Sequence, residues 1–274
     1  MRASRAALSG LVKTTWAGAR SDVAVVTLNA PDSLNALTEA MGNEFHDAVT
    51  DSALRGRARA LVLTGAGRAF SAGGDLRWLR ARHDAAPDSN VETMRAFYAK
   101  YLSVLSGPVP IPTIAAVNGP AVGAGLCLAM ACDMRVAARG AKLGVTFGKL
   151  NLHAGMGGSL TMPHLIGSEA ALRLMLSSEL VSAEEAHRIK LVGEVAEDAS
   201  ERAVALADEL TGACGPMATA TMVETVRSQK WAGEEEALQR EAEVQAACYQ
   251  TTDFKNALEQ AISGVRTAPE WLGE

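Results

Sequence analysis

Two turns rich in small residues, about fifty positions apart, are the part of this sequence most able to do chemistry. The first is Ala-Phe-Ser-Ala-Gly-Gly-Asp-Leu at 69–76, and the second is Asn-Gly-Pro-Ala-Val-Gly-Ala-Gly at 118–125. Small side chains let a ligand approach backbone N–H groups closely. A helix N-terminus leaves such groups unpaired and favours negative charge. Two such turns facing one another would therefore offer a pair of N–H donors to a developing oxyanion.

Each turn is expected to connect a buried strand to a helix. The runs at 60–63 and 113–117 are short and apolar, as is typical of buried strands, and a short helix is expected at 124–132. The recurrence of strand, turn and helix predicts an α/β fold with right-handed crossovers. The two turns then lie at the carboxyl ends of their strands.

The remaining pattern extends this architecture in both directions. Further strands are expected at 11–16, 23–28, 134–138 and 142–147, and helices at 38–50 and 91–106. The polar stretch 83–90 is expected to be a loop and a mobile lid over a bound ligand. From residue 168 the pattern is helical, with helices expected at 168–177, 182–189, 199–210 and 234–249.

Composition argues against several classes of protein. The 274 residues carry a formal net charge of −5, which gives no support for nucleic-acid binding. No apolar run approaches the roughly 18 residues of a membrane span. The scattered cysteines form no CxxC pair, so neither a zinc site nor a disulfide framework is expected. They are Cys127, Cys132, Cys214 and Cys248.

The first twenty residues are basic, contain no acid and are rich in Ser and Ala. Two interpretations are open: a short mitochondrial targeting segment within residues 1–10, or a disordered start before the first strand. The first would place the protein in the mitochondrial matrix, and the second would leave it in the cytoplasm.

The two turns and several shorter motifs resemble the crotonase, or enoyl-CoA hydratase/isomerase, superfamily over residues 23–272. The motifs are Leu-Asn-Ala-Pro at 28–31, Leu-Asn-Ala-Leu at 34–37, Ala-Cys-Asp at 131–133 and Gly-Met-Gly-Gly-Ser at 155–159, besides the two turns. The resemblance implies a spiral of ββα units at 11–200, with a helical C-terminal extension at 201–274 that assembles trimers or dimers of trimers. It also implies an acyl-CoA substrate, whose enolate oxygen is held by the N–H groups of Gly74 and Ala124. Coenzyme A enters as part of the substrate, and no separate cofactor or metal is implied.

This sequence departs from the family's pattern at two positions. Typical hydratases of the family align water and move protons with two glutamates, and the matching positions here hold Cys127 and Phe147. Neither residue can replace a carboxylate as part of a water-aligning pair. The sequence therefore predicts an intact oxyanion hole without the usual acid–base residues.

Two residues are candidates to supply the missing chemistry. His153 lies in a loop that the resemblance places at the wall of the active site. A neutral His153 would be a reasonable base near a helix N-terminus, and the alternative is a loop histidine bonded to backbone. Cys127 is a candidate nucleophile if a helix N-terminus stabilises its thiolate, and the alternative is a buried apolar side chain.

Several further residues are expected to contact the substrate. By resemblance, the backbone near Ala36, Ala72, Asp75 and Leu76 holds the adenine and pantetheine of CoA, while Asp75 is also expected to cap a turn or helix. Trp78, Phe147, Glu92 and Tyr98 are candidates for the acyl pocket. The alternative is core packing for Trp78, and a polar helix face for Glu92 and Tyr98. Arg68, Arg77 and Arg266 are candidate partners for the CoA phosphates.

The sequence thus predicts an enoyl-CoA hydratase/isomerase-like enzyme that acts on an acyl-CoA thioester. Proton transfer would fall to His153 or to an ordered water. The missing glutamates keep two alternatives open, which are an acyl-CoA-binding protein without turnover, and an acyl-CoA decarboxylase or thioesterase. Decarboxylation needs little beyond an oxyanion hole and a pocket that destabilises a carboxylate.

Overall fold

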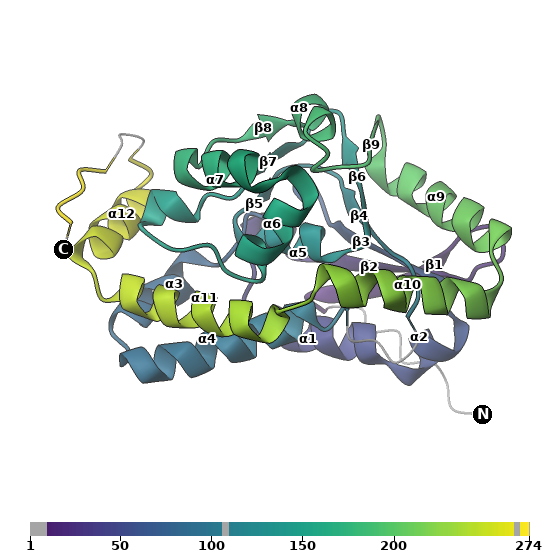
Figure 1. The fold of residues 1–274 in the computed structure, drawn as a ribbon, viewed down its shortest axis with the longest axis horizontal. Coiled ribbons are helices and arrows are strands. Elements are labelled where there is room, and N and C mark those ends of the chain that lie inside the picture. Colours follow the sequence, from purple (N-terminus) through teal and green to yellow (C-terminus); the bar gives the residue numbers. More distant parts are fainter. Residues whose placement is uncertain (1–9, 106–109, 266–268, 274) are drawn as a thin grey trace.

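The computed structural model describes residues 10–105, 110–265 and 269–273. Its centre is a six-stranded sheet in the order β1-β2-β3-β4-β6-β9 (Figure 1). Its strands are β1 (Val12–Ala17), β2 (Val23–Leu28), β3 (Ala60–Gly65), β4 (Thr113–Val117), β6 (Met134–Ala138) and β9 (Glu194–Ala196). Strands β1 and β2 are antiparallel, whereas β2 through β9 pair in parallel. A smaller sheet joins β5 (Ala121–Val122), β7 (Lys142–Gly144) and β8 (Val181–Ser182).

The central strands are apolar because they are covered on both faces. Every residue of β3 and β4 is buried. On one face, alternate residues such as Val62 and Ile114 pack against the alanines of helix α9 (Ala199–Ala213). Ala199, Ala203 and Ala207 recur every four residues, so they lie on one side of that helix. This close helix–sheet contact fixes the strand ends from which the two turns emerge.

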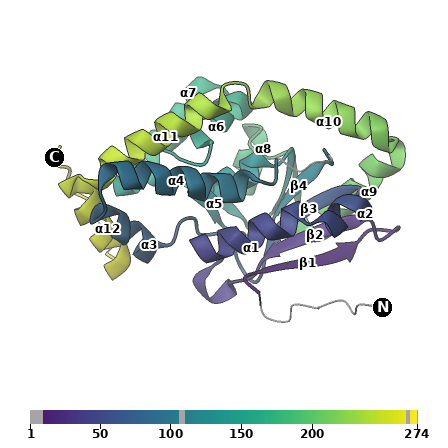
Figure 2. The ribbon, with the colours of Figure 1, turned by 90° about the horizontal axis from the view of Figure 1, so that it is seen from below.

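The larger cluster of core residues lies on the other side of the sheet. The helices besides α9 are α1 (Glu39–Thr50), α2 (Ser52–Arg57), α3 (Leu76–His83), α4 (Pro87–Leu102), α5 (Ala124–Ala131), α6 (Gly158–Ile166), α7 (Ser168–Ser177), α8 (Ala183–Arg188), α10 (Pro216–Lys230), α11 (Glu234–Tyr249) and α12 (Thr252–Ser263). Two short 3-10 turns are η1 (Pro31–Ser33), between β2 and α1, and η2 (Phe147–Leu150), between β7 and α6. Helix α11 runs along α4 (Figures 1 and 2). Helix α5 is buried at all eight of its residues.

Much of the predicted α/β pattern is confirmed. The strands expected at 23–28, 113–117 and 134–138 and the helices expected at 168–177 and 234–249 have the predicted bounds. The chain from α9 onward is helical, as expected. The prediction for residues 1–10 falls, except for Gly10, outside the described residues.

The predicted lid at 83–90 is wrong. Helix α3 extends to His83 and α4 begins at Pro87, so the connection is only three residues long. Proline fits the first turn of a helix, where its missing N–H is not needed. Asn90, which looked like a loop residue, is fully buried and donates from its side-chain amide to the Arg82 carbonyl at 2.7 Å. Helices α10 and α12 were not predicted.

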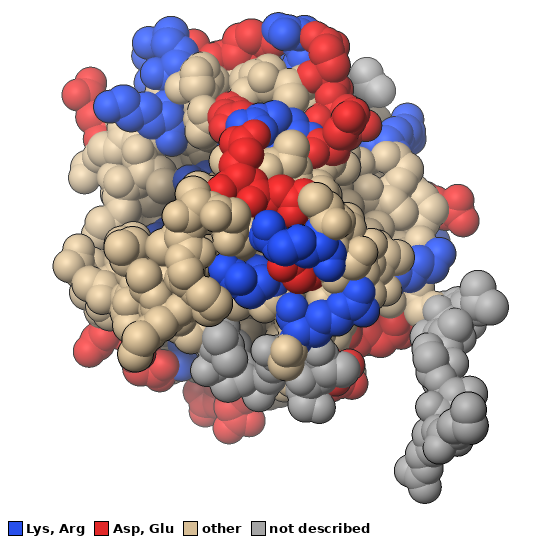
Figure 3. All heavy atoms as spheres, turned by 90° about the vertical axis from the view of Figure 1, so that its right-hand side faces the viewer, with Lys and Arg blue, Asp and Glu red and all other residues tan. Residues whose placement is uncertain are grey.

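Charges of both signs lie side by side on the face shown in Figure 3. Arg202 on α9, for example, pairs with Glu194 and Glu209. Of the helices that the structure describes, none is both long enough and apolar enough to cross a membrane.

Candidate functional site

The two small-residue turns lie against one another at the carboxyl ends of β3 and β4. Ser71 and Ala121 form an isolated parallel bridge between them. Gly73 has a φ of +92°, and a Cβ at this position would lie 2.7 Å from the Val122 carbonyl oxygen and 3.5 Å from the Ala124 nitrogen. A side chain on residue 73 would therefore force the turns apart. This close approach explains why residue 73 is a glycine.

Buried polar side chains hold the first turn in place. Asn35 is fully buried, and its amide nitrogen donates to the carbonyls of Ala66 and Ala69, each at 2.9 Å. The Ser71 hydroxyl donates to the Asn35 carbonyl at 2.8 Å and accepts from the Gly73 N–H at 3.2 Å. These bonds fix the backbone of the turn without using the N–H of Gly74.

The N–H groups of Gly74 and Ala124 both remain unpaired for separate structural reasons. Gly74 bridges Leu37 in parallel, and that bridge uses the Gly73 carbonyl and the Asp75 N–H. Ala124 is the first residue of α5, where an N–H has no carbonyl one turn before it. Among the described residues, neither N–H has an acceptor. Both are thus available to a ligand oxygen.

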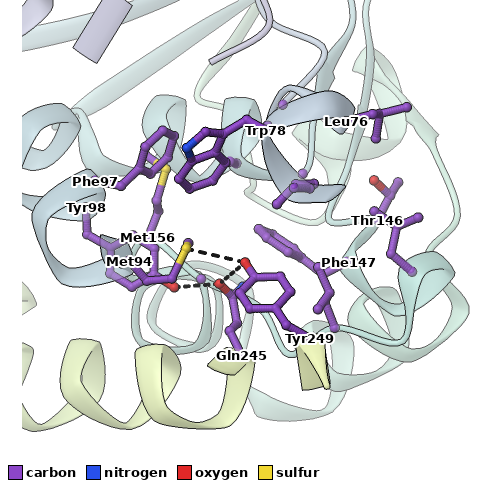
Figure 4. Close-up of a pocket in the computed structure, with 18 of the residues that line it drawn as sticks. Leu76, Trp78, Met94, Phe97, Tyr98, Thr146, Phe147, Met156, Gln245 and Tyr249 are labelled. Carbon is purple, nitrogen blue, oxygen red and sulfur yellow. Dashed lines mark hydrogen bonds between the residues drawn. The ribbon is translucent and has the colours of Figure 1, made fainter. Parts of the chain in front are cut away.

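An apolar cavity of about 100 Å³ lies beside these two donors. Its walls come from the two turns, from α3 and α4, from the segment 146–156 and from α11 (Figure 4). The side chains around it include Trp78, stacked on Phe97 with ring centroids 4.7 Å apart, and Phe147, which points into the cavity (Figure 4). No carboxylate, imidazole, ammonium or guanidinium group is among the described residues that line it.

The polar side of the cavity is a cluster of Tyr98, Gln245 and Tyr249 (Figure 4). The Gln245 amide nitrogen donates to the His153 carbonyl at 2.7 Å. A carbonyl can only accept, so the amide oxygen must face the two phenols. Tyr98 donates to it at 2.8 Å, and Tyr249 donates to it at 3.2 Å or to the Met94 sulfur at 3.4 Å. The phenol oxygens therefore keep lone pairs that accept hydrogen bonds. Burial raises the pKa of both phenols, so they stay neutral.

A buried carboxylate supports the next helix of the site. Glu241 of α11 is fully buried and accepts from the N–H groups of Gly157 and Ser159, at 2.8 and 2.9 Å, at the start of α6. Burial raises the pKa of Glu241, although these hydrogen bonds oppose the shift. Glu241 satisfies donors that a helix start leaves unpaired. It does not line the cavity, so we assign it a structural role.

A second hollow, which we call the outer groove, lies between η2, α7, α11 and α12 and has a volume of about 1080 Å³. Three apolar side chains line both the cavity and the outer groove, namely Phe147, Leu150 and Leu152. We call these three residues the partition.

The structure brings seven of the sequence-predicted site residues together around the cavity. They are Gly74, Ala124, Ala72, Leu76, Trp78, Tyr98 and Phe147. Glu92 is exposed and does not line the cavity. Two others lie beside the first turn without lining the cavity. Ala36 precedes Leu37, the bridge partner of Gly74, and the Asp75 carboxylate caps α3 by accepting from the Trp78 N–H at 2.8 Å. Arg266, a candidate phosphate partner, lies outside the described residues.

Neither candidate for the missing chemistry is among the described residues that line the cavity. Cys127 is 1% exposed, and burial raises the pKa of its thiol, which disfavours a thiolate. His153 is half-buried and lines the outer groove instead. Its Nδ1 lies 2.7 Å from the Ala154 carbonyl, so Nδ1 carries a proton and Nε2 is the free base in the neutral ring.

Gln245 and Tyr249 are cavity residues that the sequence analysis missed. They lie on α11, more than a hundred residues after the turns. A local signal was available, because Glu241, Gln245 and Tyr249 recur every four residues and so share one face of a helix. A helix face that is buried yet polar indicates a site better than an apolar face does.

Comparison with known proteins gives consistent results. A sequence profile described as enoyl-CoA hydratase/isomerase matches residues 18–265. A probable enoyl-CoA hydratase of Rhodobacter capsulatus is 40% identical over 177 residues, which cover 64% of this chain and 66% of that protein. A probable enoyl-CoA hydratase of Bacillus subtilis is 31% identical over 255 residues, or 92% of this chain and 96% of that protein. The crystal structure of an enoyl-CoA hydratase from Bacillus halodurans matches with a TM-score of 0.81 and 25% identity, over 91% of this chain and 99% of that one. The expected crotonase fold is confirmed.

Proposed function

We propose a reaction for this chain from the premise that it belongs to the enoyl-CoA hydratase/isomerase family. It binds an acyl-CoA thioester and stabilises the enolate form of that thioester. The enolate oxygen accepts hydrogen bonds from the N–H groups of Gly74 and Ala124. The observation that carries the proposal is this pair of unpaired donors beside an apolar cavity.

The two donors are suited to catalysis because they are fixed before the substrate arrives. Negative charge grows on the thioester oxygen as the enolate forms, and a preorganised donor is worth about 3 kcal/mol at that stage. The N-terminus of α5 adds a favourable dipole at Ala124. Apolar walls keep water from weakening these interactions.

Hydration of an enoyl thioester is the reaction we propose first. The phenol oxygens of Tyr98 and Tyr249 donate to Gln245 and can accept from a water molecule in the cavity. Such a water would present a lone pair to the β-carbon. In the absence of a lining carboxylate, we propose that the proton reaches the α-carbon through water, with His153 as the alternative from the sequence.

Decarboxylation is the second candidate, and one observation favours it. The described lining residues include no cationic group to stabilise a substrate carboxylate and no carboxylate or imidazole base. A malonyl-type thioester would lose CO₂ there, its electron pair would pass into the enolate, and a phenol or water would protonate the α-carbon. This route needs a proton donor but no base.

We propose the remaining properties on more general grounds. The backbone near Ala36, Ala72, Asp75 and Leu76 would hold the adenine and pantetheine of CoA. Copies of the chain would associate as a homotrimer or a dimer of trimers. Exposed apolar side chains support association, for example Met217 of α10, which is 83% exposed. The relatives reported above come from bacteria, which favours the cytoplasm over a mitochondrial matrix.

The reaction can be tested with a panel of short enoyl-, 3-hydroxyacyl- and malonyl-type CoA thioesters in deuterated water, with products measured by mass spectrometry. A hydrated or dehydrated product would support the first candidate, and loss of CO₂ with deuterium at the α-carbon would support the second. Saturable binding with unchanged thioesters would contradict both and favour an acyl-CoA-binding protein. Absence of binding would contradict the whole proposal.

A further inference from the structure

We propose that the partition of Phe147, Leu150 and Leu152 limits the cavity to short acyl groups. Removing one of these side chains would let a longer acyl group extend into the outer groove. The inference rests on the proposed function, because it takes the cavity as the acyl site. Phe147 thereby has a role of its own at the position where a catalytic residue was expected, namely closing the cavity.

The first argument is volume. An apolar protein cavity of about 150 Å³ holds one benzene, a molecule of six carbons. The cavity beside Gly74 and Ala124 has only about 100 Å³. It therefore accommodates an acyl group of roughly four carbons, and the far end of a longer chain would meet the partition.

The second argument is that the partition is thin. Each of its three side chains touches the cavity on one side and the outer groove on the other. Phe147 and Leu150 are only half-buried, so their removal exposes little new core. The three side chains of the partition therefore separate a cavity of about 100 Å³ from a groove of about 1080 Å³.

The third argument is that the backbone carrying the partition is held in place. A Cβ on Gly148 would lie 2.8 Å from the Ser178 hydroxyl, so η2 is pressed against the end of α7. The Leu152 N–H donates to the Phe147 carbonyl at 3.1 Å, and the Asn151 amide donates to the Thr251 hydroxyl at 3.2 Å. The partition can therefore open only if its side chains move, and replacing one of them with a smaller residue has the same effect.

The outer groove has the character that an acyl tail requires. Apolar side chains from three helices line it, among them Leu172 and Met175 of α7, Val244 of α11 and Ala257 of α12. Burying a methylene in such surroundings tightens binding by about fourfold. Several methylenes of a long chain would therefore favour the groove once the partition is removed.

Binding of butyryl-, octanoyl- and dodecanoyl-CoA by isothermal titration calorimetry tests this inference without requiring turnover. The wild type should bind butyryl-CoA and gain no affinity beyond it. Phe147→Ala should tighten dodecanoyl-CoA at least tenfold relative to butyryl-CoA. Leu172→Asp, added to Phe147→Ala, should cancel that gain by placing a charge in the groove. Met222→Ala removes an exposed apolar side chain on α10 and should leave the affinities for all three thioesters unchanged.

The outcomes separate the inference from the proposed function. Wild-type affinity that keeps rising about fourfold per methylene up to dodecanoyl-CoA would refute the proposed role of the partition. So would an unchanged preference in a folded Phe147→Ala protein that still binds butyryl-CoA. If circular dichroism shows that Phe147→Ala does not fold, Leu150→Ala carries the same expectation. Failure of the wild type to bind any acyl-CoA would instead refute the proposed function, and the inference with it.

Discussion

Replacing Ala124 by proline removes one proposed oxyanion donor at a position where proline is compatible with the fold. Ala124 is the first residue of α5, and proline is favoured at that position because its N–H has no helical partner. The residue before a proline must avoid the helical region. Gly123 already does so, with φ 54° and ψ −125°. No protein hydrogen bond of the described residues is lost.

These facts separate the expected effect on rate from the effect on stability. Loss of one oxyanion donor typically lowers kcat by about 10²–10³, which corresponds to about 2.7–4 kcal/mol. The proline ring also replaces the amide hydrogen with a Cδ atom at the cavity wall, so we expect the upper end of that range. Stability should change by no more than about 1 kcal/mol, or about 2–4 °C in Tm for a protein of this size.

The assay compares kcat and Tm of Ala124→Pro with those of the wild type and of Ala124→Gly, using the thioester that the substrate panel identifies. Glycine keeps the N–H group, so this control should remain within about threefold of the wild-type rate. A folded Ala124→Pro enzyme with kcat within tenfold of the wild type would refute the oxyanion role of this N–H.

Four further outcomes are expected. Tyr98→Phe should lower the hydration rate at least tenfold while costing about 1 kcal/mol of stability in urea unfolding; an unchanged rate would exclude a water-holding phenol. Arg227→Met should destabilise by about 3–5 kcal/mol, because the mostly buried Asp133 loses its charged partner. Although burial opposes the shift, bonds from Arg227 hold the pKa of Asp133 below its usual value. The pair's contribution to stability is therefore present above about pH 4 and disappears as pH falls through the lowered pKa; unfolding series in acid should show this loss in the wild type and not in the variant. Cys127 should resist iodoacetamide until the protein unfolds, since burial raises its pKa, and peptide mass mapping of labelled native protein would detect the opposite. His153→Ala should lower kcat less than tenfold because the ring lines the outer groove; a larger loss would assign proton transfer to the imidazole.

The parts of the fold that the sequence predicted are those with a strong local pattern. The strand at 113–117 is a short apolar run, and the helix at 234–249 has a clear periodicity, so both have the expected bounds. Helix α10 was missed because it presents apolar residues to solvent. Met217, Met222 and Val226 are more than half exposed, so they do not mark one buried face.

In the candidate site, too, the features with a local pattern could be predicted and those that depend on tertiary packing could not. The unpaired N–H of Ala124 follows from the local start of a helix and could be predicted. The recurrence of Glu241, Gln245 and Tyr249 marks one face of α11, but that this face meets the cavity depends on how α11 packs against α4, which no local pattern contains. For the same reason, the sequence could not place His153 on the outer groove rather than on the cavity.

Because α11 contributes to the site, the order of synthesis determines when the site can be completed. The turn at 118–125, the later of the two, is synthesised about a hundred residues before Glu241 and Gln245. At about 5–20 residues per second, this interval lasts roughly 5–20 seconds. During that time the start of α6 lacks the carboxylate that accepts from Gly157 and Ser159, and the face of α4 that will meet α11 is uncovered. A nascent chain stopped before α11 therefore carries both small-residue turns without a closed cavity, and exposes apolar surface of the kind that chaperones bind.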